Sequence, residues 1–272
     1  MPLKPPFSSL KAWLIDMDGV LYAGTRPLPA AAEFINALQE SHTPFLFLTN
    51  NATRTPAAYV QRLAQMGNHV GESDIFTSAL ATARYVKENF PPPRRVIVIG
   101  GPGIRQAVQD AGYELVDEAD RAELVISAMD TKATYARMAE AALAIRAGAP
   151  WIQTNPDPTF PSERGILPGA GSIMAFLQAA TEQQPRIIGK PETGIFQQAL
   201  AILGSRPEET VMLGDRLETD ILGGHRAGLK TICVLTGIAS RAQAEAYHPR
   251  PDWIIDDLTA LLEGEAQETT GI

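Results

Sequence analysis

Short apolar runs alternate along the chain with segments whose apolar residues recur at helical spacing. An apolar run at 13–15 ends in polar residues, a helical pattern covers 29–40, and a second apolar run covers 43–49. A continuous apolar run is typical of a strand buried on both faces, and strands joined through helices pair in parallel. The pattern therefore predicts a parallel βαβ unit near the start of the chain.

The same alternation returns after residue 185 and extends the predicted sheet. Its later strands fall at 187–190, 210–215, 231–235 and 253–255. Strands alternating with helical patterns in this way predict an α/β fold with a doubly wound, Rossmann-like parallel sheet.

The region between these two parts repeats the α/β pattern without paired acids. It predicts strands at 95–99, 124–127 and 151–154 and helices near 104–111 and 135–147. We therefore expect a core domain of residues 1–78 and 186–272, interrupted by an inserted α/β domain of residues 79–185. The polar end of the chain, 264–272, is expected to be frayed.

Composition narrows the class of protein. The chain has 272 residues, 45% of them hydrophobic, and a formal net charge of -8, which argues against a broad nucleic-acid or anionic-membrane surface. Its single cysteine, Cys233, excludes an intrachain disulfide and is expected in the core. Because no segment approaches the ~18 uninterrupted apolar residues of a membrane span, the cytoplasm is the expected location.

The first strand ends in a pair of acids that can carry chemistry. Asp16 and Asp18 are separated by one residue and followed by Gly19, so an extended chain would project both carboxylates the same way. Glycine would let the backbone approach a ligand closely. Neighbouring carboxylates repel each other unless a cation or a shared proton lies between them. A divalent metal with a phosphate ester meets that need, whereas the alternative is a strand end followed by an Asp-Gly turn.

Three further polar clusters also follow predicted strands. They are Thr49-Asn50-Asn51, Gly189-Lys190-Pro191-Glu192, and the segment from Gly214-Asp215 to Asp220. In an open parallel sheet the carboxyl ends of the strands converge on one crevice, so these clusters are expected to meet the acids there.

The order of the four motifs resembles the haloacid dehalogenase (HAD) superfamily of phosphohydrolases, over residues 13–261. The insertion between the second and third motifs resembles the α/β cap of the type IIA branch, as do the segments 153–157 and 168–171. That branch includes p-nitrophenyl phosphatases, nucleotide phosphatases, and pyridoxal-phosphate and phosphoglycolate phosphatases. The resemblance implies a HAD core with an inserted cap.

The chemistry of the acids can be reasoned from their position. Asp16 at the strand tip is suited to attack phosphorus and form an aspartyl-phosphate. Asp18 is suited to act as general acid toward the leaving alcohol and then as general base toward water. The resemblance implies that Mg²⁺ is held by the Asp16 side chain, the Asp18 backbone carbonyl and Asp215, an arrangement that suits this cation.

The remaining motif residues would bind the phosphoryl group. If the resemblance carries over, the Thr49 hydroxyl and the Asn50 N–H bind phosphate oxygens, with Asn51 beside them; a plain turn with a helix cap is the alternative. Lys190 would neutralise the phosphoryl charge. Asp220 would orient Lys190 or a metal-bound water, or would cap a helix.

These residues predict a Mg²⁺-dependent phosphomonoester hydrolase that acts on a small phosphorylated metabolite beneath a mobile cap. The alternatives are a phosphomutase, which protects the same intermediate from water, and a non-catalytic phosphometabolite-binding protein. Binding alone does not require a nucleophile with an acid two residues on. Nucleotides, sugar phosphates, phosphoglycolate and pyridoxal phosphate all fit as substrates, and Asn155, Pro156 and Asp157 of the cap are expected to select among them. Because related caps often pair, the resemblance also suggests that the protein forms a homodimer.

Other features point to structural roles. The glycine-rich turn at 100–103 lacks the full dinucleotide fingerprint and is expected to be a plain strand-to-helix turn. The histidines show no ligand spacing and are expected at the surface or in packing; they are His42, His69, His225 and His248. No Gly-x-Ser-x-Gly elbow supports a serine hydrolase.

Overall fold

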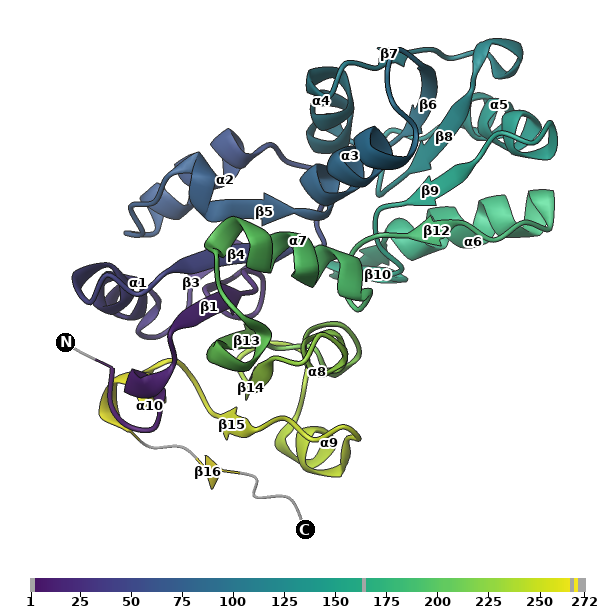
Figure 1. Ribbon diagram of the computed structural model, residues 1–272. Coiled ribbons are helices and arrows are strands. Elements are labelled where there is room, and N and C mark those ends of the chain that lie inside the picture. Colours follow the sequence, from purple (N-terminus) through teal and green to yellow (C-terminus); the bar gives the residue numbers. More distant parts are fainter. Residues whose placement is uncertain (1–2, 163–164, 265–266, 269–272) are drawn as a thin grey trace. The chain divides into compact units, whose positions relative to one another are not determined.

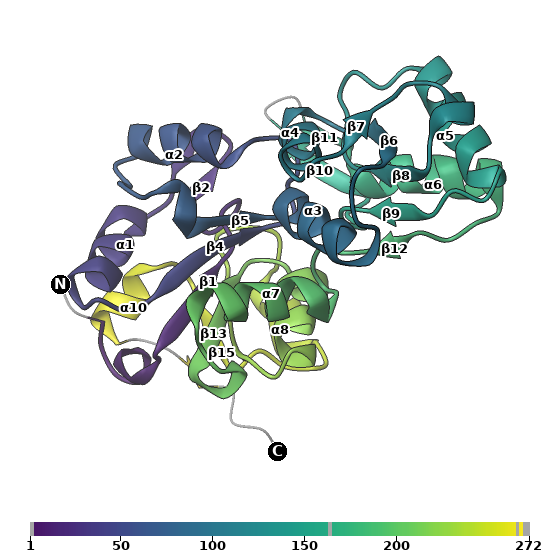
Figure 2. The same cartoon turned by 45° about the horizontal axis from the view of Figure 1, so that its top comes forward.

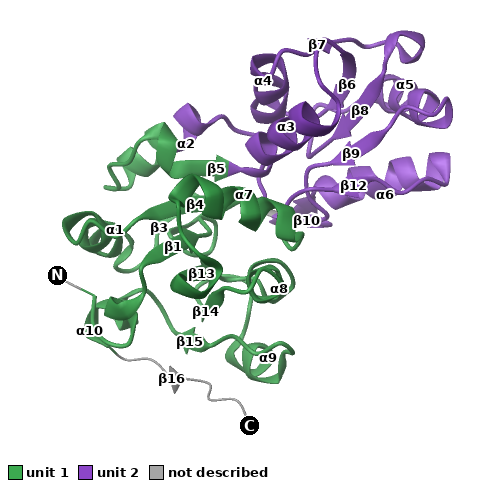
Figure 3. Ribbon diagram, in the orientation of Figure 1, with its two compact units in different colours: residues 1–49, 60–76, 190–272 green, residues 50–59, 77–189 purple. Residues whose placement is uncertain are grey.

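The computed structural model describes residues 3–162, 165–264 and 267–268. Its chain divides into two compact units (Figure 3). Unit 1 comprises Met1–Thr49, Val60–Phe76 and Lys190–Ile272, and unit 2 comprises Asn50–Tyr59 and Thr77–Gly189. The inserted region was expected at 79–185, whereas unit 2 runs from 77 to 189 and also includes residues 50–59.

Unit 1 is organised around β1 (Ala12–Ile15), which lies inside a seven-stranded sheet (Figure 1). The strand order is β16-β15-β14-β13-β1-β4-β5. The chain moves outward from β1 to β4 and β5, and later outward on the other side through β13, β14 and β15. This reversal at β1 confirms the doubly wound sheet, and ligands of such sheets bind at the carboxyl ends of the strands beside the reversal.

The elements of unit 1 are short and closely spaced. Its strands are β1, β2 (Tyr22–Ala23), β3 (Arg26–Pro27), β4 (Phe45–Thr49), β5 (Ile75–Thr77), β13 (Thr210–Gly214), β14 (Lys230–Val234), β15 (Trp253–Ile255) and β16 (Gln267–Glu268). Its helices are α1 (Ala31–Glu40), α2 (Pro56–Gln65), α7 (Thr193–Leu203), α8 (Leu222–Arg226), α9 (Arg241–Ala246) and α10 (Thr259–Glu263). The strand β5 and the helix α2 each cross the boundary between the units.

Burial explains why the first apolar run forms the central strand. Trp13, Leu14 and Ile15 are fully buried, and Leu14 pairs in parallel with both Met212 of β13 and Leu46 of β4. Helices cover both faces of the sheet: α1 contacts α10, and α7 contacts α8 (Figure 2). A strand covered on both faces must be apolar throughout, so polar residues first appear where it ends.

Unit 2 is a second α/β assembly with a five-stranded sheet of order β12-β9-β8-β6-β7. All pairs in that sheet are parallel. Its strands, with the separate β10–β11 hairpin, are β6 (Arg95–Ile99), β7 (Glu114–Leu115), β8 (Leu124–Ser127), β9 (Trp151–Gln153), β10 (Thr159–Ser162), β11 (Gly165–Pro168) and β12 (Arg186–Ile187). Its helices are α3 (Ser78–Asn89), α4 (Pro102–Asp110), α5 (Tyr135–Arg146) and α6 (Ala170–Thr181).

The structure corrects the assignment of the apolar run at 187–190. We expected this run to extend the first sheet, but β12 pairs in parallel with β9 of unit 2. The N–H groups of Ile188 and Gly189 then donate to Gln153 O (3.1 Å) and Thr154 O (2.8 Å). Periodicity alone cannot assign a short strand to one of two sheets, and here backbone pairing decides. Lys190 therefore enters unit 1 directly after the second sheet ends.

The end of the chain differs in part from the expectation. Gln267 and Glu268 form the short antiparallel strand β16 beside β15, because the edge of the sheet offers free backbone groups. Residues 265–266 and 269–272 of the expected frayed end lie outside the described residues.

The structure confirms three smaller expectations. Cys233 is fully buried in the core, and burial, aided by the charges of Asp220 and Asp215, raises its pKa to about 12. All four histidines are exposed. The turn at 100–103 is a plain turn: the first N–H groups of α4, from Gly103 and Ile104, donate to Thr53 O (3.1 Å) and Ala52 O (3.0 Å).

Among the described residues, no helix has the length and hydropathy of a membrane span.

Candidate active site

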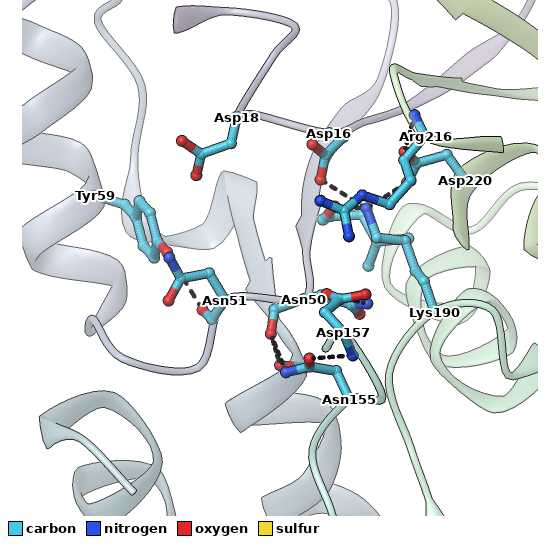
Figure 4. Close-up of polar contacts among 12 residues, drawn as sticks. Asp16, Asp18, Asn50, Asn51, Tyr59, Asn155, Asp157, Lys190, Arg216 and Asp220 are labelled. Atoms are coloured by element: carbon cyan, nitrogen blue, oxygen red, sulfur yellow. Dashed lines mark hydrogen bonds and ion pairs between the residues drawn. The ribbon is translucent and has the colours of Figure 1, made fainter. Parts of the chain in front are cut away.

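A buried lysine joins two carboxylates at the carboxyl end of β1. The Nζ of Lys190 lies 2.6 Å from Asp16 Oδ1 and 2.6 Å from Asp220 Oδ1, and it also donates to Leu48 O at 2.8 Å (Figure 4). Lys190 and Asp220 are each 1% exposed and Asp16 is 8% exposed. Held on three sides at this depth, the ammonium group has a fixed position beside the Asp16 carboxylate.

Asp215 completes a cluster of acids. It follows β13, the neighbour of β1, and one carboxylate oxygen from each of Asp16, Asp215 and Asp220 lies within 4.8 Å of the others. Asp215 Oδ2 accepts the Ile238 N–H at 2.9 Å, and Asp220 Oδ2 accepts the Arg216 N–H at 3.1 Å. Asp220 lies in a π-helical turn, Leu217–Ile221. Asp220 therefore contacts both the backbone at the start of that turn and the Lys190 ammonium, and it lies inside the turn, not at its cap position.

The pKa values of this cluster follow from its burial and its charges. Burial raises the pKa of Asp16 well above its ordinary range, with Lys190 opposing the rise and Asp220 and Asp215 adding to it. Burial and then the charge of Asp220 raise the pKa of Asp215 to about 7. Burial alone would lower the pKa of Lys190, but the carboxylates of Asp16 and Asp220 outweigh burial and raise it. The lysine is therefore charged.

The donor set fits a divalent cation. Three buried carboxylates face one ammonium group, so the cluster carries excess negative charge in a site of low dielectric constant. A bound cation would remove this excess and would lower the pKa values of Asp16 and Asp215 again. Oxygen ligands of this kind, with open positions for water and phosphate, suit Mg²⁺.

Asp18 occupies a different environment from Asp16. It is half-buried, and its carboxylate is not among the three that approach one another. The fully buried Tyr22 directs its hydroxyl toward Asp18 Oδ2 at 3.5 Å, and the Arg62 guanidinium lies 4.2 Å from the Tyr22 ring centre. A carboxylate on this partly open side can exchange protons with water, whereas Asp16 is enclosed by charges. The two acids thus have environments that suit different roles.

Sequence reasoning missed the segment that follows β14. Its Thr236 hydroxyl donates to Gly19 O at 2.6 Å, and Ile238 supplies the N–H to Asp215. Gly19 adopts φ +82°, and a Cβ there would lie 2.3 Å from Asp215 Oδ2. Glycine is required at 19 because the backbone must turn against Asp215. The segment follows β14, another strand of the same sheet, and this position in the sequence was a signal that it could lie at the site.

The Thr49-Asn50-Asn51 motif is divided between the units. Thr49 is the last residue of β4 and is buried in unit 1, whereas Asn50 and Asn51 belong to unit 2. The Asn51 Oδ1 accepts the N–H (3.0 Å) and the hydroxyl (2.6 Å) of Thr53, so its side chain forms the turn that was the alternative to phosphate binding. Because Asn50 is bonded to Thr49, its N–H lies at the end of β4 whatever the placement of unit 2.

The structure thus brings together four predicted residues of unit 1: Asp16, Lys190, Asp215 and Asp220. Asp18, Gly19 and Thr49 belong to the same unit and follow β1 or end β4. Asn50 and Asn51 follow Thr49 in the chain and belong to unit 2.

Comparison with known proteins supports the same grouping. The family model described as haloacid dehalogenase-like hydrolase matches residues 13–114, and a HAD-hydrolase-like model matches residues 187–261. An acid sugar phosphatase of Staphylococcus epidermidis is 39% identical over 252 residues, which is 93% of this chain and 96% of that protein. A 5'-nucleotidase of Bacillus subtilis is 40% identical over 252 residues, 93% of this chain and 97% of that protein.

A solved structure matches the whole fold. The glycerol phosphate phosphatase of Mycobacterium tuberculosis, in complex with magnesium, is 36% identical and superposes with a TM-score of 0.89, covering 97% of this chain and 79% of that chain. Both the sequence matches and the structural match extend across the inserted region. The chain therefore belongs to the haloacid dehalogenase-like hydrolases, within their phosphatases.

Proposed function

We propose that this protein is a Mg²⁺-dependent phosphomonoester hydrolase that acts on a small phosphorylated metabolite through an aspartyl-phosphate on Asp16. The observation that carries the proposal is the contact between the Lys190 ammonium and the Asp16 carboxylate, 2.6 Å apart, with the Asp215 and Asp220 carboxylates beside them. The relatives are named an acid sugar phosphatase, a 5'-nucleotidase and a glycerol phosphate phosphatase, and these names support a small phosphate ester as substrate.

In this proposal Asp16 attacks phosphorus, and the bond between phosphorus and the leaving alcohol oxygen breaks. Asp18 donates its proton to that oxygen, so the alcohol leaves neutral. In the second half of the reaction Asp18 takes a proton from water, the water oxygen attacks phosphorus, and inorganic phosphate leaves while the Asp16 carboxylate is restored. The first half of the reaction removes one proton from Asp18, and the second half returns it.

The other residues stabilise charge. Lys190 neutralises the phosphoryl oxygens as a fixed point charge. The Thr49 hydroxyl and the Asn50 N–H donate hydrogen bonds to those oxygens, and Asp220 keeps Lys190 in position. Asp16, Asp215 and the Asp18 backbone carbonyl would hold Mg²⁺, which when bound supplies further positive charge to the phosphate oxygens. We further propose that residues 79–185 form the cap and that the protein is a homodimer, both of which the resemblance implies. We also propose a cytoplasmic location.

The test is the release of inorganic phosphate from p-nitrophenyl phosphate. The protein should hydrolyse this ester with Mg²⁺, lose activity in EDTA and regain it when Mg²⁺ is restored. Activity that persists in thoroughly chelated protein would exclude the metal role. Transfer of the phosphoryl group to a second hydroxyl of the substrate, without free phosphate, would indicate a phosphomutase, and binding of phosphate esters without turnover would indicate a binding protein.

A further inference from the structure

The chain passes between the two units at four points, and three of them converge on Asn50. The crossings lie at 49/50, 59/60, 76/77 and 189/190. Asn50 is the first residue of unit 2, Ser78 lies one residue past the third crossing, and Gly189 is the last residue of unit 2. Residues remote in sequence are thus gathered around the backbone that follows Thr49.

Two buried side chains of unit 2 hold the Asn50 carbonyl. The Ser78 hydroxyl donates to Asn50 O at 2.5 Å, and the Asn155 side-chain amide donates to it at 2.7 Å (Figure 4). Ser78 is fully buried, and Asn155 and Asn50 are 4% and 7% exposed. A buried carbonyl that accepts two hydrogen bonds from fixed donors has a single orientation, and so has the peptide group that joins Asn50 to Asn51.

The Asn50 side chain is held as well. Its amide nitrogen donates to Asp157 Oδ2 at 3.1 Å, and Asp157 is itself tied to Asn155 by an N–H bond to Asn155 Oδ1 at 3.2 Å. Gly189 closes the arrangement, because a Cβ at that residue would lie 2.5 Å from Asn50 Oδ1. We name Ser78, Asn155 and Asp157 the Asn50 clasp.

Asn50 and Gly189 are each bonded in the chain to a residue of the candidate active site. Thr49 precedes Asn50, and Lys190 follows Gly189. On the unit 1 side, the Lys190 ammonium bonds to Leu48 O, one residue before Thr49. Because unit 2 holds both the carbonyl and the side chain of Asn50, it also fixes the direction in which the Asn50 Cα bonds to the nitrogen that carries the N–H. Thr49 ends β4 of unit 1, and Lys190 is held in unit 1.

We infer that Ser78 and Asn155, with Asp157 in support, are positioning residues that orient the Asn50 backbone for the phosphoryl group of every substrate. The inference rests on the proposed function, which assigns the Asn50 N–H to phosphate. It replaces the expected selectivity role of Asn155, because a buried side chain that bonds to the backbone acts on the shared phosphoryl group. A loss of orientation weakens binding of the phosphoryl group irrespective of the leaving group.

The experiment compares Ser78→Ala and Asn155→Ala with Thr181→Val. Thr181 is a matched control because its hydroxyl is also buried in unit 2, at 4% exposed, and donates to a backbone carbonyl, Leu177 O, at 2.7 Å. For each variant, kcat/KM is measured with p-nitrophenyl phosphate and acetyl phosphate, the inhibition constant with orthovanadate, and unfolding by thermal melting.

Each clasp variant should lower kcat/KM by about tenfold, by the same factor for both substrates, and raise the orthovanadate inhibition constant by a similar factor. Thr181→Val should have a lower melting temperature but keep kcat/KM and the orthovanadate inhibition constant within about twofold of the wild type. Asp157→Asn, at a half-buried position, should give a smaller loss of the same kind and serves where a buried variant does not fold.

Two results would overturn the inference. One is a clasp variant whose constants match those of Thr181→Val, which would leave the clasp a purely structural role. The other is a loss confined to p-nitrophenyl phosphate, which would return Asn155 to leaving-group selection. If the wild-type protein releases no phosphate, the proposed function is wrong independently of the clasp. The affinity of the same variants for orthovanadate, measured by calorimetry, then tests whether the clasp positions the Asn50 backbone.

Discussion

The two units use the same architecture but differ in the balance of charge at their strand ends. In unit 1 the residues after β1 and β13 bring Asp16, Asp215 and Asp220 around the single ammonium of Lys190. In unit 2 the acid that follows β8, Asp130, forms one ion pair with Arg137 at 2.9 Å. The first arrangement carries excess negative charge and the second is balanced.

The strand ends of unit 2 also satisfy their polar groups internally. The Ser127 side chain at the end of β8 bonds to both Gln153 and Trp151, and the Gln153 amide nitrogen donates to Asn155 O at 2.8 Å and Ala170 O at 3.1 Å. No group of this network needs a ligand to complete its hydrogen bonds. A parallel sheet thus offers a place for a site, whereas the unbalanced side chains at its edge determine whether chemistry takes place there.

The largest expected effect comes from removing one carboxylate from the unbalanced cluster. Asp16→Asn should lower turnover on the order of 10⁴-fold or more, because an amide is not an anionic nucleophile. The matched control is Asp130→Asn in unit 2, which also removes a strand-end carboxylate and should leave kcat within about twofold. Steady-state release of phosphate checks both. Substantial multiple turnover in Asp16→Asn would refute the covalent mechanism.

A smaller loss is expected at the half-buried acid. Asp18→Asn removes the proton donor and acceptor but keeps the backbone carbonyl, so the rate should fall by roughly 10²–10⁴-fold. The loss should be greater for an alkyl phosphate such as glycerol phosphate than for p-nitrophenyl phosphate, whose leaving group needs little protonation. Rates measured with both esters test this. If Asp18→Asn hydrolysed both esters at nearly the wild-type rate, Asp18 would not be the general acid and base.

The contrast between the units also explains how far the sequence could be interpreted. Apolar runs predicted β1, β4, β6, β8, β13, β14 and β15, because a strand covered on both faces must be apolar along its length. The same signal misplaced residues 187–190, since hydrophobicity does not encode which of two sheets a strand joins. Segments that pair through backbone atoms, such as β16, leave no such pattern.

For the site, the strand-end rule found Asp16, Lys190, Asp215 and Asp220, which the structure brings together. Thr236, two residues after β14, falls under the same rule but carries no acid or lysine to mark it. Tyr22 lies outside the rule, because its contact with Asp18 depends on tertiary packing. Nor could the rule assign Asn50 to unit 2, because that depends on Ser78 and Asn155 from distant parts of the chain. Motifs identify reactive side chains, while the residues that hold them in place require the fold.

The excess charge of unit 1 should also be visible as a pH dependence of stability. Burial raises the pKa of Asp215 in the folded protein to about 7, above its ordinary value. The folded state therefore holds this proton more tightly than the unfolded chain. The proton therefore stabilises the folded state fully below about pH 4, and this stabilisation is lost as the pH rises through about 7. The free energy of unfolding falls by at most about 4 kcal/mol over this range.

In EDTA, the melting temperature of the wild type should thus fall between pH 5 and pH 8, and Mg²⁺ should restore it at pH 8 by binding the ionised cluster. Asp215→Asn cannot ionise and should melt higher than the wild type at pH 8 in EDTA, with little response to Mg²⁺. Asp256→Asn, whose side chain is 81% exposed, is the surface control. A wild type that is more stable at pH 8 than at pH 5 without metal would contradict the raised pKa.

The smallest effect is expected from the balanced network of unit 2. Ser127→Ala removes the hydroxyl that accepts the Trp151 indole N–H at 2.6 Å and bonds to Gln153, and both partners are buried. Leaving these groups without a partner should cost about 1–3 kcal/mol of unfolding free energy. The network carries no charge, and it meets the Asn50 clasp where the Gln153 amide nitrogen donates to Asn155 O. Because Ser127→Ala does not remove this bond, kcat with p-nitrophenyl phosphate should stay within about twofold of the wild type. Urea unfolding and steady-state kinetics on the same preparation measure the two effects. A fall in kcat as large as that of Asp18→Asn would show that the strand ends of unit 2 take part in the chemistry, and the contrast between the two units would no longer hold.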